Sequence, residues 1–185
     1  MPVTTLDPKT AMIIIDLQKG IVGLALADGI ETVIDNSRQL AEAFRRNGLP
    51  VVLVNVDAIA PGRTEQSRSP RDLPADWAEI VPELGAQSED LKVTKRTWGA
   101  FASTDLGQQL GALGVTQVVI TGVATSIGVE STARQAYEAG FNVTLAIDAM
   151  TDLQPEAHRA SIANIFPRLG ETGTTKEIIG LLEGS

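Results

Sequence analysis

The stretch that decides the fold runs from residue 117 to residue 148 and reads QVVITGVATSIGVESTARQAYEAGFNVTLAID. Its first five residues and the segment Asn142–Ile147 are apolar runs, typical of strands buried on both faces of a parallel sheet. Between them we predict a helix over Val129–Ala139, which Gly140 ends. A strand, a helix and a second strand in this order predict a βαβ unit with parallel strands.

The same alternation extends along the rest of the chain. Further strands are predicted at 11–15, 50–56 and 91–95, and further helices at 31–47, 104–113, 155–165 and 175–182. Thr104 is the expected N-cap of the second of these helices, and Thr174 with Glu177 forms a capping box before the last. We therefore expect a single domain over residues 1–185 with an α/β fold, in three α/β/α layers around a parallel, Rossmann-like sheet.

Residues 57–91 depart from this alternation. They contain four prolines and are predicted to be a long irregular excursion with a short helix near Trp77. Long loops of compact domains often bind ligands or cover a site, but many are surface connections. Both interpretations stay open at this point.

The composition argues against several kinds of site. The chain has no cysteine, which excludes thiolate nucleophiles, disulfides and thiolate metal sites, and its one histidine, His158, cannot build a multi-histidine zinc site. We expect no metal and no cofactor. A net charge of −8, without a basic cluster longer than Arg45–Arg46, argues against a nucleic-acid partner.

The hydropathy pattern argues against a membrane partner. No apolar run approaches the ~20 residues of a membrane-spanning helix. The first residues, MPVTTLDPKT, lack the basic and apolar regions of a signal peptide. We expect a cytoplasmic protein that acts on a small molecule.

Polar residues at the predicted strand ends are the candidate site, because α/β sheets bind ligands at the carboxyl ends of their strands. They are Asp16, Asp57, Lys95, the turn Ala124–Gly128 and Asp148. A partly desolvated Asp16 can act as an acid or base, and a nearby Lys95 can stabilise a developing anion. Gly128 permits close approach of a ligand to the turn, whose free N–H groups can bind an oxyanion. The alternatives are a capping Asp16 and a solvated Lys95.

The turn also allows a serine-hydrolase interpretation. Ala124 to Gly128 is an A-x-S-x-G version of the nucleophile elbow with Ser126 at its centre, and Asp148 and His158 follow in the order of that class. Together they would supply a nucleophile and its base. Ala124 in place of the first glycine weakens this interpretation.

Four stretches together resemble the isochorismatase-like superfamily of cysteine hydrolases. They are IIIDLQKG, VTKRTWGAF, TGVATSIGVESTARQAYEAGFNVTLAIDA and TTKEIIGLL. The resemblance implies the isochorismatase-like hydrolase fold. In its amidohydrolase members an Asp–Lys–Cys triad is catalytic; Asp16 and Lys95 match the first two residues, whereas Gly128 stands at the position of the cysteine. The resemblance also implies a cis peptide at Val123–Ala124, with the Ala124 and Gly128 amides as an oxyanion hole.

Isochorismatases resemble this chain in having glycine where the amidohydrolases have cysteine. In them an aspartate protonates a vinyl ether, water adds and pyruvate leaves. The resemblance therefore implies hydrolysis with Asp16 as general acid or base and Lys95 as its electrostatic partner. Pocket residues are expected at Ile21, Asp57, Trp98 and Ser126. Trp98 and nearby Phe101 are equally compatible with packing.

The chain differs from both isochorismatases and nicotinamidases at substrate-related positions, so the resemblance does not identify the substrate. Val56 stands nearest the position where isochorismatases carry a glutamine, and the chain has no histidine in the region where nicotinamidases bind a metal through Asp and His. The resemblance also implies a homo-oligomer. The alternatives are a small-molecule-binding homologue without activity and the Ser126 hydrolase.

Overall fold

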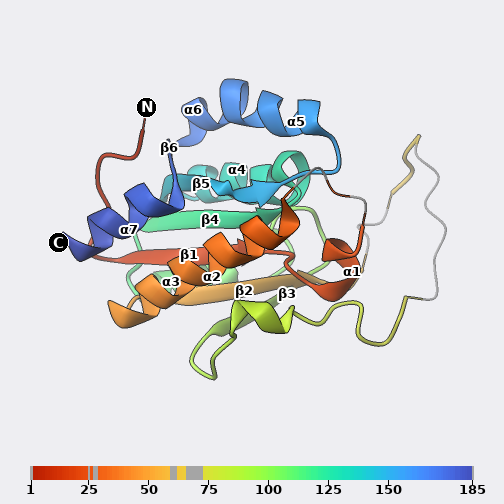
Figure 1. Cartoon of the computed structure of the whole chain (residues 1–185), viewed down its shortest axis with the longest axis horizontal. Helices are drawn as coiled ribbons and strands as arrows, with labels where there is room; N and C mark the ends of the chain where they lie inside the picture. The colour runs from red at the N-terminus through yellow and green to blue at the C-terminus, as the bar shows by residue number, and fades with distance from the viewer. Residues whose placement is uncertain (1, 25, 27–28, 59–61, 66–72, 185) are drawn as a thin grey trace.

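The structure, a computed structural model, describes residues 2–24, 26, 29–58, 62–65 and 73–184. Its centre is a six-stranded, all-parallel sheet in the order β3-β2-β1-β4-β5-β6 (Figure 1). The strands are β1 (Thr10–Ile15), β2 (Val51–Val56), β3 (Leu91–Lys95), β4 (Gln117–Val123), β5 (Asn142–Thr151) and β6 (Glu171–Gly173). The central strands β1 and β4 are buried at every position, as their continuous apolar sequences predict. The expected three-layer α/β fold is confirmed.

Helices cover both faces of the sheet (Figure 1). One face packs against α3 (Leu106–Ala112), α4 (Glu130–Glu138) and α6 (Phe166–Leu169). The other face packs against α2 (Ile30–Arg46) and α7 (Thr175–Glu183).

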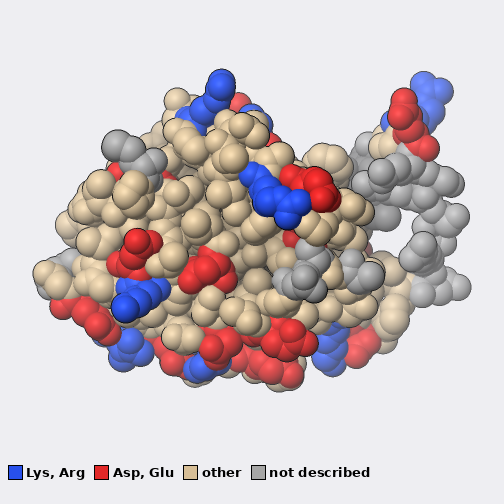
Figure 2. Space-filling view, turned by 45° about the horizontal axis from the view of Figure 1, so that its top comes forward, with Lys and Arg blue, Asp and Glu red and all other residues tan. Residues whose placement is uncertain are grey.

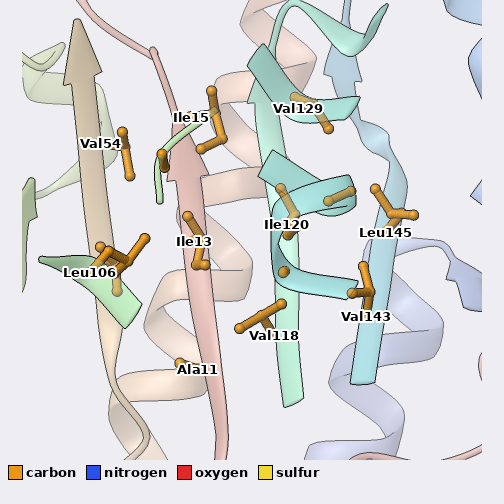
Figure 3. Packing of buried hydrophobic residues seen from close by; sticks show 14 of the residues in the cluster. Ala11, Ile13, Ile15, Val54, Leu106, Val118, Ile120, Val129, Val143 and Leu145 are labelled. Atoms are coloured by element: carbon orange, nitrogen blue, oxygen red, sulfur yellow. The ribbon is translucent and has the colours of Figure 1, made fainter. Parts of the chain in front are cut away.

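Alternate side chains of β1 pack into the two hydrophobic clusters that lie on opposite faces of the sheet. Ile13 and Ile15 point toward the α3 and α4 side, beside Val118 and Ile120 of β4, as Figure 3 shows. Met12 and Ile14 point toward α2 and α7. Each fully buried aliphatic side chain stabilises the fold by about 1.5–3 kcal/mol relative to exposure. The short strand β1 is thus anchored on both faces, which fixes the position of the residue that follows it.

Several predicted boundaries differ from the structure. No helix forms near Trp77; residues 75–78 form turns, and the helical piece of this region is the 3₁₀-helix η1 (Pro82–Leu84). The N-cap of α3 is Asp105 rather than Thr104, although the Thr104 hydroxyl accepts a hydrogen bond from Leu106 N. Parts of the excursion, residues 59–61 and 66–72, lie outside the described residues.

The C-terminal third also has more elements than predicted. The helix expected over 155–165 is α5 (Pro155–Ala160) followed by the π-helix η3 (Ser161–Ile165) and α6. Neither β6 nor the short helix α1 (Lys19–Val22) was predicted from the sequence. β5 runs on to Thr151, so Asp148 lies inside this strand and not at its end. The capping box of Thr174 and Glu177 at the start of α7 is confirmed.

Acidic side chains gather along the lower edge of the face drawn in Figure 2, with basic side chains as separate groups among them. This distribution agrees with the net charge of −8. No helix in the described part of the chain is long and apolar enough to cross a membrane.

Gly122 gives a test of this packing. It has a φ of 115°, and a Cβ there would collide with the backbone of Ile15 on the neighbouring strand. We expect Gly122→Ala to lower the free energy of unfolding by at least about 3 kcal/mol, since backbone strain adds to overpacking. Chemical denaturation measures this change. Gly111→Ala in α3, where a Cβ meets open space, is the control and should be neutral or stabilising. Equal stability of the two variants would contradict the packing described.

Candidate active site

The candidate site is built around a buried ion pair between two strands. Asp16 follows β1, and Lys95 is the last residue of β3, with β2 between them. Lys95 Nζ donates to Asp16 Oδ2 at 2.7 Å and to the carbonyl of Thr97 at 3.3 Å. The two residues are only 6% and 2% exposed. The structure thus brings together two residues that were predicted from the sequence to lie at the candidate site.

The second carboxylate oxygen of Asp16, Oδ1, differs from Oδ2 in its surroundings. Oδ1 is buried and, within the described residues, has no hydrogen-bond partner. Burial raises the pKa of Asp16 from 3.8 to about 6, although the charge and hydrogen bond of Lys95 act in the opposite direction. Desolvation outweighs the ion pair, because Lys95 satisfies only one of the two oxygens. A carboxyl group with such a pKa can exchange a proton near neutral pH.

The chain turns sharply at Asp16, and the side chain of the nearby Gln18 joins this turn to β2. Asp16 has a φ of 52°, in the left-handed region that side-chain-bearing residues seldom occupy. Gln18 is fully buried. Its Oε1 accepts from Val56 N at 2.7 Å, and its Nε2 donates to Val56 O at 3.0 Å and to Trp77 O at 3.2 Å. The side-chain amide therefore continues the pairing with β2 after the backbone has left the sheet.

The returning arm of the excursion, residues 76–79, forms hydrogen bonds and ion pairs with the same turn. Lys19 N donates to Glu79 O and Gly20 N to Trp77 O, both at 2.9 Å. Lys19 Nζ forms ion pairs with Asp76 and Glu79. The Trp77 ring lies where a Cβ of Gly20 would be. This part of the excursion is therefore a fixed support of the Asp16 turn.

The opposite side of the site is the turn after β4. The peptide bond Val123–Ala124 is cis, and the π-helix η2 (Thr125–Val129) follows it. A Cβ at Gly128 would lie 3.3 Å from Asp16 Oδ2 and 3.0 Å from Ile15 Cγ2. The backbone of Gly128 therefore faces the carboxyl group directly, and a side chain here would touch it.

The serine triad is not assembled. Asp148 Oδ1 accepts from the backbone N and Oγ1 of Thr175, at the start of α7. His158 Nδ1 lies 2.8 Å from Thr125 Oγ1, and Ser126 N donates to Asp152 Oδ2 at 2.6 Å. The sequence order was misleading because Asp148 lies within β5 and its carboxylate holds the start of α7.

The expected pocket residues have varied surroundings. Ile21 of α1 packs against the α2 side of the core, and Asp57 accepts from Arg96 at 3.2 and 3.3 Å. Trp98 is half-exposed on the loop after Lys95. Their contacts with a ligand, like that of Ser126, stay predictions. Among the described residues, no group of three acidic or histidine side chains is placed to hold a metal ion.

Known proteins resemble this chain over most of its length. Residues 10–177 match the model of the isochorismatase domain. The isochorismatase family protein YwoC of Bacillus subtilis is 44% identical over 178 residues, covering 92% of this chain and 93% of the relative. An isochorismatase family protein from Burkholderia thailandensis superposes with a TM-score of 0.93 at 40% identity, covering 97% of this chain and 98% of the other.

The chain belongs to the isochorismatase family and has its hydrolase fold. More distant relatives include enzymes named for amide hydrolysis. Nicotinamidase 3 of Arabidopsis thaliana is 28% identical over 181 residues, covering 86% of this chain and 83% of the relative.

Gln18 is the site residue that the sequence analysis did not single out. We expect Gln18→Met to lower the free energy of unfolding by about 1–3 kcal/mol, because it leaves the partly buried N–H and C=O of Val56 without these partners. Thermal and urea denaturation measure the loss. Gln108→Met, on the exposed surface of α3, is the matched control and should change little. A Gln18 variant as stable as this control would contradict the assigned role.

Proposed function

We propose that the protein hydrolyses a small molecule by acid catalysis, without a nucleophilic side chain at residue 128. Asp16 is the general acid, and Lys95 stabilises the carboxylate that remains after proton transfer. The reaction that this site fits best is the cleavage of a vinyl ether such as isochorismate.

The Asp16 carboxyl group is the observation that carries this proposal. Its Oδ1 is buried, lacks a hydrogen-bond partner in the described chain and belongs to a group with a pKa of about 6. A general acid works best when its pKa lies near the working pH. Lys95 holds the other oxygen at 2.7 Å and fixes the orientation of the carboxyl group.

The reaction needs only these groups and water. Asp16 gives its proton to the terminal carbon of the enol ether, which creates a cationic carbon next to the ether oxygen. Water adds to that carbon, and its extra proton returns to Asp16. The resulting hemiketal breaks into an alcohol and a ketone, which is pyruvate when the substrate is isochorismate.

The chain itself favours this chemistry over amide hydrolysis by a thiol. Nicotinamidase 3 is named for an amide substrate, and the resemblance assigns a catalytic cysteine to the amidohydrolases. This chain has no cysteine, and residue 128 is glycine. Addition of water to a protonated enol ether forms no covalent enzyme intermediate and so requires no nucleophilic side chain.

Pyruvate release from isochorismate is the decisive assay. We expect the wild type to release pyruvate and Asp16→Asn to be slower by about 10²- to 10⁴-fold, the usual contribution of a general acid. Asp105→Asn, at an exposed position before α3, is the control and should retain the wild-type rate. Equal rates in wild type and Asp16→Asn would refute acid catalysis by Asp16. Binding without turnover in either protein would favour the inactive homologue.

The pH dependence tests the role of Asp16 separately. A general acid is active when protonated, so kcat/KM should be highest below pH 6 and fall as the pH rises through about 6. Lys95 lowers the pKa of Asp16, so Lys95→Gln should move this fall to higher pH, besides reducing the rate. A kcat/KM that rises through pH 6 would instead identify Asp16 as a general base.

A further inference from the structure

We infer that His158, as the neutral tautomer with its proton on Nδ1, is a positioning residue for the turn that faces Asp16. It acts through Thr125, the first residue of the π-helix η2, and its effect on catalysis rests on the function proposed above. The resemblance motifs assign no role to this histidine.

The hydrogen bonds around Thr125 determine the tautomer. Thr125 is fully buried, and its Oγ1 lies 3.1 Å from Thr151 O and 2.8 Å from His158 Nδ1. A hydroxyl has one proton, and a carbonyl oxygen only accepts. The bond to Thr151 therefore uses the Thr125 proton, and the bond to His158 forms only if Nδ1 donates. The chain of donation runs from His158 through Thr125 to the end of β5.

His158 has the environment that this role requires. It lies on α5 and is partly buried. Burial lowers its pKa below the usual 6.5; the Asp152 charge opposes this shift, and the Arg159 charge adds to it. The imidazole is therefore neutral at pH 7, with one proton to place on either nitrogen. Protonation at lower pH keeps the proton on Nδ1, so the bond to Thr125 survives.

The turn is held from several sides, and His158 supplies the contact from α5. Asp152, almost fully buried, accepts from Ser126 N at 2.6 Å and from Gln154 N at 3.2 Å. On the other side Thr132 Oγ1 donates to Gly128 O at 2.7 Å. Thr125 stands at the start of this turn and Gly128 near its end. A displacement of Thr125 therefore moves the backbone that faces Asp16.

Nuclear magnetic resonance tests the tautomer directly, because His158 is the only histidine in the sequence. In protein labelled with ¹⁵N at histidine, two-bond nitrogen–proton correlations should show the proton on Nδ1 at pH 7. Thr125→Val keeps the shape of the side chain and removes the hydroxyl, so the proton should shift toward Nε2. A wild-type histidine protonated on Nε2 would overturn the inference.

Substitutions then test the positioning role. An asparagine amide can take the place of the Nδ1 donor, whereas alanine cannot. We expect His158→Ala to lower kcat for pyruvate release by roughly tenfold or more with little change in KM, and His158→Asn to restore most of the rate. Thr125→Val should cost less in the His158→Ala background than in the wild type, because the bond to His158 is already lost there and only the bond to Thr151 O remains to be removed. Glu156→Gln, exposed on the same helix, is the control and should retain the wild-type rate.

Amide hydrogen exchange keeps the test independent of turnover. The Val129 amide, which donates to Ala124 O at 3.1 Å across this turn, should exchange faster in His158→Ala than in His158→Asn, whether or not isochorismate is a substrate. Absence of pyruvate release by the wild type would refute isochorismate as the substrate and leave these two measurements to decide the role of His158. Equal exchange in the two variants, or equal rates in an active enzyme, would refute positioning by His158.

Discussion

The buried ion pair between Asp16 and Lys95 is the constraint on which the rest of the site depends. Removing two charges from water costs several kcal/mol for each ion, and mutual attraction recovers this cost only when the geometry is good. Here the geometry is good for one carboxylate oxygen, which lies 2.7 Å from Nζ. The other oxygen is left without a partner in the described structure. The pair is therefore held in place by its surroundings more than it stabilises them.

Those surroundings come from segments far apart in the sequence. Lys95 reaches Asp16 across β2 because parallel strands end at the same edge of the sheet. Gln18 continues the pairing with β2, and the arm around Trp77 packs over Gly20. The turn after β4 closes the opposite side. A change in any of these segments alters the environment of the Asp16 carboxyl group. The stability of the fold and the pKa of Asp16 therefore depend on the same contacts.

The sequence predicted those parts of the site that follow from the topology of a parallel sheet. Apolar runs located β1 and β4, the short alternating stretch LKVTK located β3, and the carboxyl ends of these strands brought Asp16, Lys95 and Gly128 to one edge. Side-chain hydrogen bonding has no comparable pattern. Nothing in the spacing shows that Gln18 pairs with the backbone of Val56, or that the Asp148 carboxylate holds the start of α7. The serine triad failed for this reason: chain order says nothing of where a side chain within a long strand points.

The glycine at residue 128 has a physical consequence beyond the absence of a nucleophile. A Cβ at this position would lie closer than ordinary van der Waals contact to Ile15 Cγ2, to the Val123 carbonyl and to Asp16 Oδ2, at 3.0, 3.2 and 3.3 Å. A larger side chain would extend from that crowded point next to the carboxyl group. Glycine leaves this space open, and under the proposed function the attacking group is water. A site of this kind selects substrates that become electrophilic on protonation, since water alone is a weak nucleophile. Enol ethers meet this condition, whereas unactivated amides need the stronger nucleophile that this chain lacks.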